Sequence, residues 1–174
     1  MEPDRDPDGE IVKEVYARFG LAVYFAQCCE TSLIGLLADI ETASCAQPSQ
    51  AKFDEFYLKN EKLTFGNLLR KFEKLFSPDG HLLARLHAFK LERDELSHRF
   101  FRKHSLRLTT VGGCTELISM LETVAASYES IDADLAKLAA SRATQRGMPE
   151  SEYLLKLAEI ERELFDKASH GQFD

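Results

Sequence analysis

Three residues that can carry acid–base or ionic chemistry, Arg93, Asp94 and His98, lie close together in the stretch LERDELSHRFF, residues 91–101. Arginine stays charged at any accessible pH and can hold a carboxylate or phosphate group with two parallel hydrogen bonds. Histidine can take up or release a proton at neutral pH, since its ordinary pKa is about 6.5. An Asp one turn before a His can orient the ring and favour its protonated form. These residue types therefore predict a site where one ligand is held by charge and meets a proton donor or acceptor.

The helix that carries these residues has an apolar seam, and Arg93 falls inside it. The seam contains Leu82, Leu86, Phe89, Leu96 and Phe100. A guanidinium buried there without a partner costs several kcal/mol, so Arg93 must be ion-paired or open onto a cleft. His98 lies about 140° away around the helix, on the same side as Asp94.

Two interpretations of Arg93 remain open at this point. Its side chain can reach a ligand at the margin of the apolar face, toward the side of His98. It can instead form a salt bridge with an acidic residue of another helix, for which Glu30, Asp39 and Glu122 are the candidates. In that second case, His98 is a partly exposed surface residue.

The elements that must position these residues are helices almost throughout, because the apolar residues follow helical spacing and no strand alternation is present. We expect an all-α fold, an antiparallel helical bundle of about five helices within a single domain over residues 1–174. Residues 1–9 are acidic and are expected to be disordered. Helices are expected over 10–45, 65–76 with Thr64 as N-cap, 81–105, 114–143 and 150–168, with a short helical piece over 51–60.

The C-terminal part, residues 108–174, predicts a helical hairpin. In residues 114–143 the apolar positions are Leu117, Leu121, Val124, Tyr128, Ile131, Leu135 and Leu138. In the last expected helix they are Tyr153, Leu157, Ile160 and Leu164. A short loop between the two implies antiparallel packing. The first helix is apolar around much of its circumference between Leu21 and Ile40, which is typical of a central bundle helix or of one buried in a dimer interface.

The charge of the chain is unevenly distributed. The net charge is -7, but residues 59–107 hold twelve Lys and Arg against six Asp and Glu, a surplus of six positive charges. The four cysteines form no CxxC pair, and the acidic N-terminus is the reverse of a secretory signal. The most apolar run, from Phe19 to Cys29, is too short to cross a bilayer. We expect a soluble cytoplasmic protein without membrane association.

A metal site is not predicted. Glu95 and His98 have the E-x-x-H spacing of carboxylate-bridged di-iron bundles, but such a site needs a second E-x-x-H, and no other histidine has a Glu three residues before it. No phosphate-binding loop, dinucleotide fingerprint or nucleophile elbow is present. No metal and no cofactor are expected.

The stretch RDELSHRFF, preceded by GHLLARLHAFKLE, resembles the R-x4–6-H signature of the HEPN superfamily, a group of all-α ribonucleases of toxin–antitoxin, abortive-infection, CRISPR and RNA-processing systems. The resemblance covers about residues 62–104. In that signature a polar residue, often Asn, follows the arginine, and here it is Asp94.

The resemblance implies a metal-independent endoribonuclease with Arg93, His98 and Asp94 as catalytic residues. It implies that His98 moves a proton at the 2′-hydroxyl or the leaving 5′-oxygen, that Arg93 holds the scissile phosphate, and that Asp94 positions the motif. Arg99, Arg102 and Lys103 follow directly and are candidates for binding RNA phosphates, while Phe100 or Phe101 can stack a base. The helical spacing favours a core position for Phe100.

The resemblance also implies a homodimer in which the motif helices of two copies face each other, and a toxin or a defence or stress component. Members that do not cleave RNA give the alternative, a helical interaction or regulatory module that binds an antitoxin or another protein partner. A third interpretation is a structural bundle in which the motif is coincidental. These interpretations differ in where they place Arg93 and His98.

Overall fold

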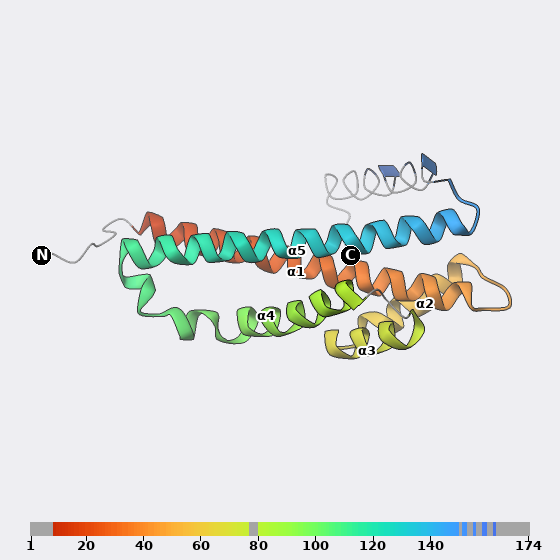
Figure 1. The fold of residues 1–174 in the computed structure, drawn as a ribbon, viewed down its shortest axis with the longest axis horizontal. Coiled ribbons are helices and arrows are strands. Elements are labelled where there is room, and N and C mark those ends of the chain that lie inside the picture. The colour runs from red at the N-terminus through yellow and green to blue at the C-terminus, as the bar shows by residue number, and fades with distance from the viewer. Residues whose placement is uncertain are drawn as a thin grey trace, which may run out of the picture. The chain divides into compact units, whose positions relative to one another are not determined.

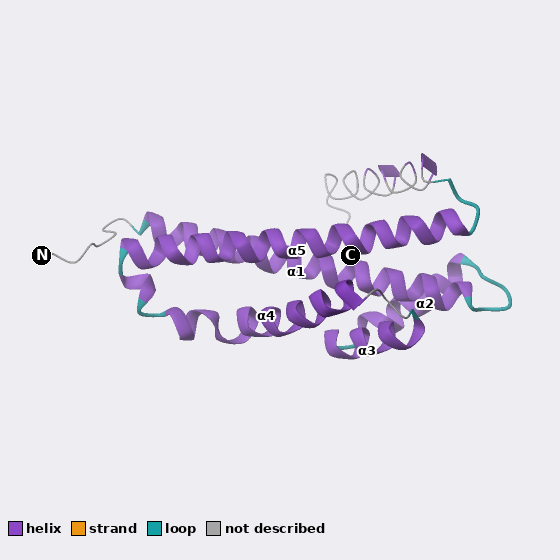
Figure 2. Cartoon of the chain, in the orientation of Figure 1, coloured by secondary structure: helices purple, strands orange, loops and turns teal. Residues whose placement is uncertain are grey.

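In the computed structural model of the protein, the described residues are 9–76, 80–149 and six later positions, 151, 152, 155, 158, 159 and 162. All regular structure in these residues is helical (Figure 2), so the expected all-α class is confirmed. The elements are α1 (Glu10–Ala43), α2 (Gln50–Glu61), α3 (Phe65–Leu75), α4 (Gly80–His104), a short 3-10 helix (Arg107–Thr109) and α5 (Val111–Gln145). The helix boundaries lie within a few residues of the expected ones.

The chain divides into two compact units, Met1–Leu135 and Ala136–Asp174, and the boundary between them falls inside α5. In the second unit, the chain is helical up to Gln145 and again at the six described positions after residue 150. The four apolar positions expected on the last helix, Tyr153, Leu157, Ile160 and Leu164, lie outside the described residues, as do residues 1–8. The hairpin and the disordered N-terminus therefore stay predictions.

Three long helices build the core of the first unit: α1, α4 and the part of α5 up to Leu135 (Figure 1). Contacts between α1 and α5 advance in the same direction along both, from Arg18 with Glu122 to Ser32 with Asp132. Contacts between α1 and α4 advance in opposite directions, from Tyr16 with Phe101 to Glu30 with Arg93. The helix α4 is thus antiparallel to both others, while α1 and α5 are parallel, because the chain reverses twice between them.

The apolar seams read from the sequence form this core. The seam residues Leu86, Phe89, Leu96 and Phe100 of α4 are buried, as are Leu117, Leu121, Tyr128, Ile131 and Leu135 of α5. The Phe89 and Tyr128 rings meet edge to face at 4.7 Å between centroids. Full burial of one such large side chain contributes about 1.5–3 kcal/mol, so a few of them stabilise the packing of α4 against α1 and α5.

The shorter helices α2 and α3 pack against the C-terminal half of α1. Ser49 caps α2 by accepting a hydrogen bond from the backbone N–H of Lys52, and Thr64 is the residue before α3, as expected. The buried Asn60 side chain donates to Glu41 at 3.0 Å, and the Phe65 ring packs at a tilt against the Phe89 ring with 4.9 Å between centroids. The first contact fixes α2 to α1, and the second fixes α3 to α4.

The turn from α4 into α5 is held by a glycine. A Cβ atom at Gly113 would lie 2.2 Å from the Arg107 carbonyl oxygen and 2.8 Å from the Thr110 hydroxyl. No real side chain tolerates the first distance, so only glycine lets the 3-10 helix fold back onto the start of α5.

The helix α1 is long and apolar enough, by length and composition, to cross a membrane, with a mean hydropathy of 1.5 over its most apolar window. Of that window, 44% is buried inside the fold, and a core helix passes the same test. Its buried residues include Ala22, Cys29, Leu33 and Leu37, which pack in the bundle. The burial supports the interpretation of α1 as a central helix, and the absence of membrane association stays a prediction.

Candidate functional site

Arg93 is ion-paired within the bundle. Its Nη2 atom lies 3.1 Å from Oε2 of Glu30 on α1, and its Nη1 atom lies 3.4 Å from Oδ1 of Asp94. The Arg93 side chain is 30% exposed and that of Glu30 is 25% exposed. Of the three acidic partners that the sequence offered, the structure places Glu30 at this position. The pair fastens the middle of α4 to α1.

Asp94 lies on the other side of Arg93 and interacts with a lysine. Lys90 Nζ donates to Oδ2 of Asp94 at 2.9 Å, one turn earlier on α4. The hydrogen bond from Lys90, followed by that from Arg93, lowers the pKa of the Asp94 carboxyl. In the described part of the chain no hydrogen bond joins Asp94 to His98, so the expected orientation of the ring by this carboxylate is not what the structure shows.

His98 is exposed on the outer face of α4, away from the Arg93–Glu30 pair. Arg102 lies one turn further along the same face, and Leu91, which is 70% exposed, lies two turns before His98. Within the residues that the structure describes, neither the His98 ring nor the Arg102 guanidinium has a hydrogen-bond or ion-pair partner. The structure therefore does not bring Arg93 and His98 to one cleft of the protomer.

The remaining basic candidates, Arg99 and Lys103, share one carboxylate. The Glu95 carboxylate forms ion pairs with Lys103 at 3.0 Å and with Arg99 at 3.7 Å. Both cations lower the pKa of Glu95, and Lys103 has the larger effect. All three side chains are exposed enough for solvent to screen the pairs, so each contributes little to stability. Of the three predicted phosphate-binding residues, Arg102 alone keeps an uncompensated charge among the described residues.

The two phenylalanines after the motif pack against α1. Phe100 is 4% exposed, which confirms the core position predicted for it. Phe101 lies 4.7 Å from Phe19 and 5.2 Å from Tyr16 between ring centroids, so it belongs to an aromatic cluster with the first helix. Both rings are engaged in packing, and neither is placed to stack a base.

A groove of about 180 Å³ lies between α4 and α5, with an apolar floor that includes Leu96, Phe100 and Val124 and a rim that includes Glu92 and His104. Partial burial raises the pKa of Glu92, and the neighbouring side chain of the buried Tyr128 opposes this shift in part. Burial followed by the Glu92 charge raises the pKa of Tyr128. Neither Arg93 nor His98 lines this groove, and sequence patterning did not single out Glu92 or Tyr128 as a pair.

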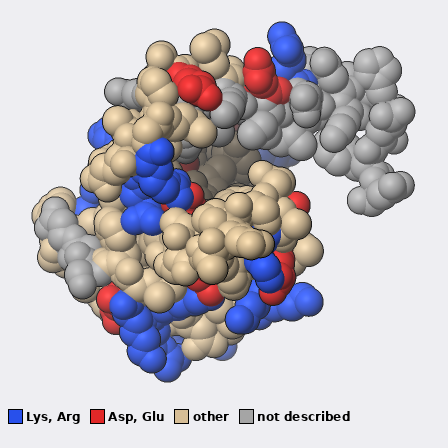
Figure 3. Space-filling model, turned by 90° about the vertical axis from the view of Figure 1, so that its right-hand side faces the viewer, with Lys and Arg blue, Asp and Glu red and all other residues tan. Residues whose placement is uncertain are grey.

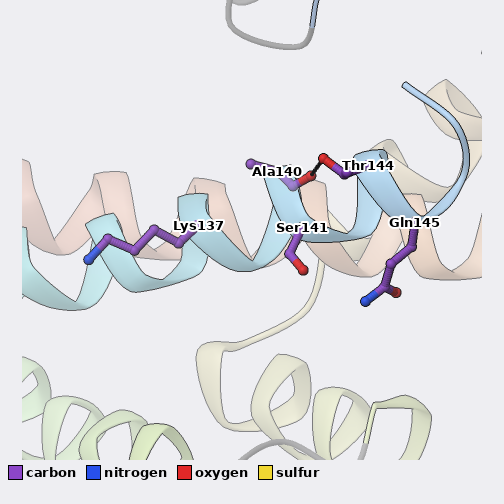
Figure 4. Close-up of a pocket in the computed structure, with 5 residues that line it drawn as sticks. All are labelled: Lys137, Ala140, Ser141, Thr144 and Gln145. Carbon is purple, nitrogen blue, oxygen red and sulfur yellow. Dashed lines mark hydrogen bonds between the residues drawn. The ribbon is translucent and has the colours of Figure 1, made fainter. Parts of the chain in front are cut away.

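A second hollow, of about 350 Å³, lies on the C-terminal end of α5 (Figure 4). Among the described residues, those that line it all belong to α5: Lys137, Ala140, Ser141, Thr144 and Gln145. The Thr144 hydroxyl donates to the Ala140 carbonyl at 3.0 Å, which is an ordinary bond within a helix. These five described residues pair no acid–base group with a nucleophile.

No group of three His, Cys, Asp or Glu side chains within the described ranges is arranged to hold a metal ion. The four cysteines lie in the described ranges and form no disulfide there, and the pKa of the Cys29 thiol is raised to about 12 by burial, with smaller contributions from Asp132 and Cys28. Cys29 donates to the Tyr128 carbonyl at 3.1 Å inside the core. A thiol in this state is a packing residue and not a nucleophile.

Comparisons with protein-family models, with curated proteins and with solved structures gave no match.

Proposed function

We propose that the chain acts on RNA as a metal-independent endoribonuclease of the HEPN type. The observation that supports this best is His98, an exposed imidazole without a partner among the described residues, with the uncompensated Arg102 one turn away. An imidazole in solvent can exchange protons with a substrate, and a guanidinium on the same face can hold a phosphate. The proposed cytoplasmic location and the role as a toxin or as a defence or stress component belong to the same proposal.

The reaction needs one group to accept a proton and another to donate one. The 2′-oxygen of the RNA bonds to phosphorus as its proton passes to one neutral imidazole, and the P–O5′ bond breaks as the 5′-oxygen takes a proton from a second, protonated imidazole. A single His98 cannot fill both roles in one step. A homodimer that brings two copies of the outer face of α4 together supplies both, and Arg102 stabilises the charge on the phosphate oxygens.

In this proposal Arg93 has a different role from the one that the family resemblance implies. Its guanidinium is already paired with Glu30, so it holds α4 in place on α1. Asp94, paired with Lys90, supports the same stretch of helix. The catalytic role is thereby assigned to His98 and the phosphate-binding role to Arg102.

The test is cleavage of a labelled single-stranded RNA in excess EDTA. We expect products with 2′,3′-cyclic or 3′-phosphate ends, and no cleavage at a position that carries a 2′-deoxynucleotide. His98→Ala should reduce the rate by a factor of about 10² or more, the usual contribution of a general acid or base. His87→Ala is the matched control, because His87 is an exposed histidine of the same helix that binds Glu73 instead. Equal activity of the His98 variant and the wild type would refute the assignment.

A non-catalytic interaction module that binds an antitoxin or another protein partner is the second candidate, and the Arg93–Glu30 pair favours it. Two of the three residues that the resemblance assigns to catalysis have partners within the protomer. In this case, wild-type protein leaves the RNA intact, and His98→Ala weakens self-association or binding of a protein partner instead. Sedimentation of the wild type and the variant distinguishes the two candidates when it is measured beside the cleavage assay.

A further inference from the structure

The outer face of α3 carries a basic hollow that the motif does not include. The inner face of this helix is buried through Phe65, Leu68, Leu69 and Phe72. On the opposite side, Asn67, Arg70, Lys71 and Lys74 follow at helical spacing and line an open hollow of about 260 Å³. These four lining residues include no carboxylate.

The two outer cations of this hollow are not neutralised within the described residues. Arg70 donates from Nη2 to Oδ1 of Asn67 at 2.9 Å and from Nε to the Gly66 carbonyl at 3.3 Å. Both acceptors are neutral, so they orient the guanidinium without cancelling its charge. Lys74 has no hydrogen-bond or ion-pair partner in the part of the chain that the structure describes.

Lys71 has the opposite role at the inner edge of the same hollow. Its Nζ lies 2.6 Å from Oε2 of Glu41 and 2.6 Å from Oδ1 of Asn60, and both Lys71 and Glu41 are largely buried. This pair anchors α3 to α1 and α2. The hollow therefore has a rigid base and two uncompensated positive charges one turn apart.

Lys and Arg side chains gather on the lower part of the face shown in Figure 3. The chain as a whole carries a net charge of -7, so a surplus of cations on one helix face is a local departure from its composition. The residues that line the hollow offer hydrogen-bond donors, and the hollow is open along the helix. An enclosed pocket would suit a free phosphate, whereas an open row of cations suits the phosphates of a linear chain.

We infer that Arg70, Lys74 and the α3 face around them bind the phosphodiester backbone of single-stranded RNA. The inference rests on the proposed function in that it names RNA as the ligand. It adds a second binding surface on a different helix from His98. Binding here is to phosphate and is therefore independent of base sequence.

The experiment measures binding of the full chain to a fluorescein-labelled 2′-O-methyl oligoribonucleotide, by anisotropy over a range of salt concentrations. The blocked 2′-oxygen prevents cleavage, so binding by α3 and catalysis through His98 are measured separately. For Arg70→Ala/Lys74→Ala we expect the slope of log affinity against log salt to decrease by about 1.4, which is about 0.7 for each phosphate that the protein no longer neutralises. At about 0.1 M salt, this corresponds to an affinity roughly 25-fold weaker.

The matched control is Lys13→Ala/Lys52→Ala, which removes the same amount of charge. These lysines are exposed and already paired with Glu10 and Glu55, so we expect affinity within about twofold of the wild type. Arg70→Lys/Lys74→Arg keeps the charge and should keep the salt slope. Thermal unfolding of each variant checks that the fold is intact.

Three results would overturn the inference. The first is an unchanged salt slope in Arg70→Ala/Lys74→Ala, and the second is no binding of the oligonucleotide by the wild type. The third is competition by poly-glutamate that is as strong as competition by unlabelled RNA. That result would assign the α3 face to an acidic protein segment. Competition by single-stranded DNA is expected, because the recognised group is the phosphate. If the wild type binds the oligonucleotide but does not cleave RNA, the proposed ribonuclease activity is refuted, while the inference that α3 binds RNA is retained.

Discussion

The two residues of the R-x4-H pattern lie in two different environments of one helix. Arg93 faces the bundle and is paired with Glu30, while His98 faces outward, exposed and without a partner among the described residues. They are separated by about 140° of helical rotation, which a flexible side chain can bridge only if its charged end is not already held. A spacing motif on one helix can thus combine a structural residue with a surface residue.

The largest stability effect is expected on the inward side of this comparison. Arg93→Ala leaves the Glu30 carboxylate partly buried and unpaired, and we expect it to lower the free energy of unfolding by about 1–3 kcal/mol, below the range for a fully buried pair. His98→Ala on the outward side should change it by less than about 0.5 kcal/mol. Urea unfolding followed by circular dichroism measures both. Equal effects of the two substitutions would remove the distinction between the two environments.

Replacing Glu92, the residue before Arg93, is expected to have a smaller effect on the free energy of unfolding, and the sign of this effect follows from its pKa. Burial raises the pKa of this carboxyl in the folded state, so its ionised form opposes folding above that pKa, and the penalty disappears below the unfolded value of about 4.5. Glu92→Gln should therefore stabilise the protein at neutral pH, by less than about 0.5 kcal/mol, and should have no effect near pH 4. Thermal unfolding over this pH range is the measurement.

Asp94 provides the comparison with the opposite sign. Lys90 and Arg93 lower the pKa of its carboxyl, so its contribution is present at neutral pH and is lost as the pH falls through the folded value. Asp94→Asn should thus destabilise the protein at neutral pH and lose its effect under acid conditions. Effects of the same sign for Glu92→Gln and Asp94→Asn would show that the two carboxylates flanking Arg93 do not differ in environment.

Helical periodicity predicted most of the fold. The apolar spacing of α4 and α5 identified the buried seams, and Thr64 marked the start of α3, because burial and capping are local signals read within a few turns. The parallel arrangement of α1 and α5 was not predicted, since the direction of packing depends on how α2 and α3 return the chain. That information is not in the pattern of any one helix.

The candidate site was predicted less completely. The position of Arg93 in the seam and its need for a partner followed from periodicity, but three carboxylates qualified, and tertiary packing selected Glu30. Asp94 has basic or titratable neighbours one turn away on both sides, Lys90 and His98, and spacing alone does not choose between them. The basic face of α3 was visible as helical spacing from Asn67 to Lys74, but the buried pairing of Lys71 with Glu41 is known only from the structure.

If Arg93 holds α4 on α1 and His98 carries the chemistry, the double variant Glu30→Met/Arg93→Met should still cleave RNA. This double variant replaces the ion pair with apolar side chains of similar length, an exchange that often preserves stability. We expect this variant to cleave RNA in EDTA at a rate within a few-fold of the wild type, while His98→Ala is slower by a factor of about 10² or more. A folded Glu30→Met/Arg93→Met variant without activity would instead assign Arg93 to the phosphate and refute its purely structural role.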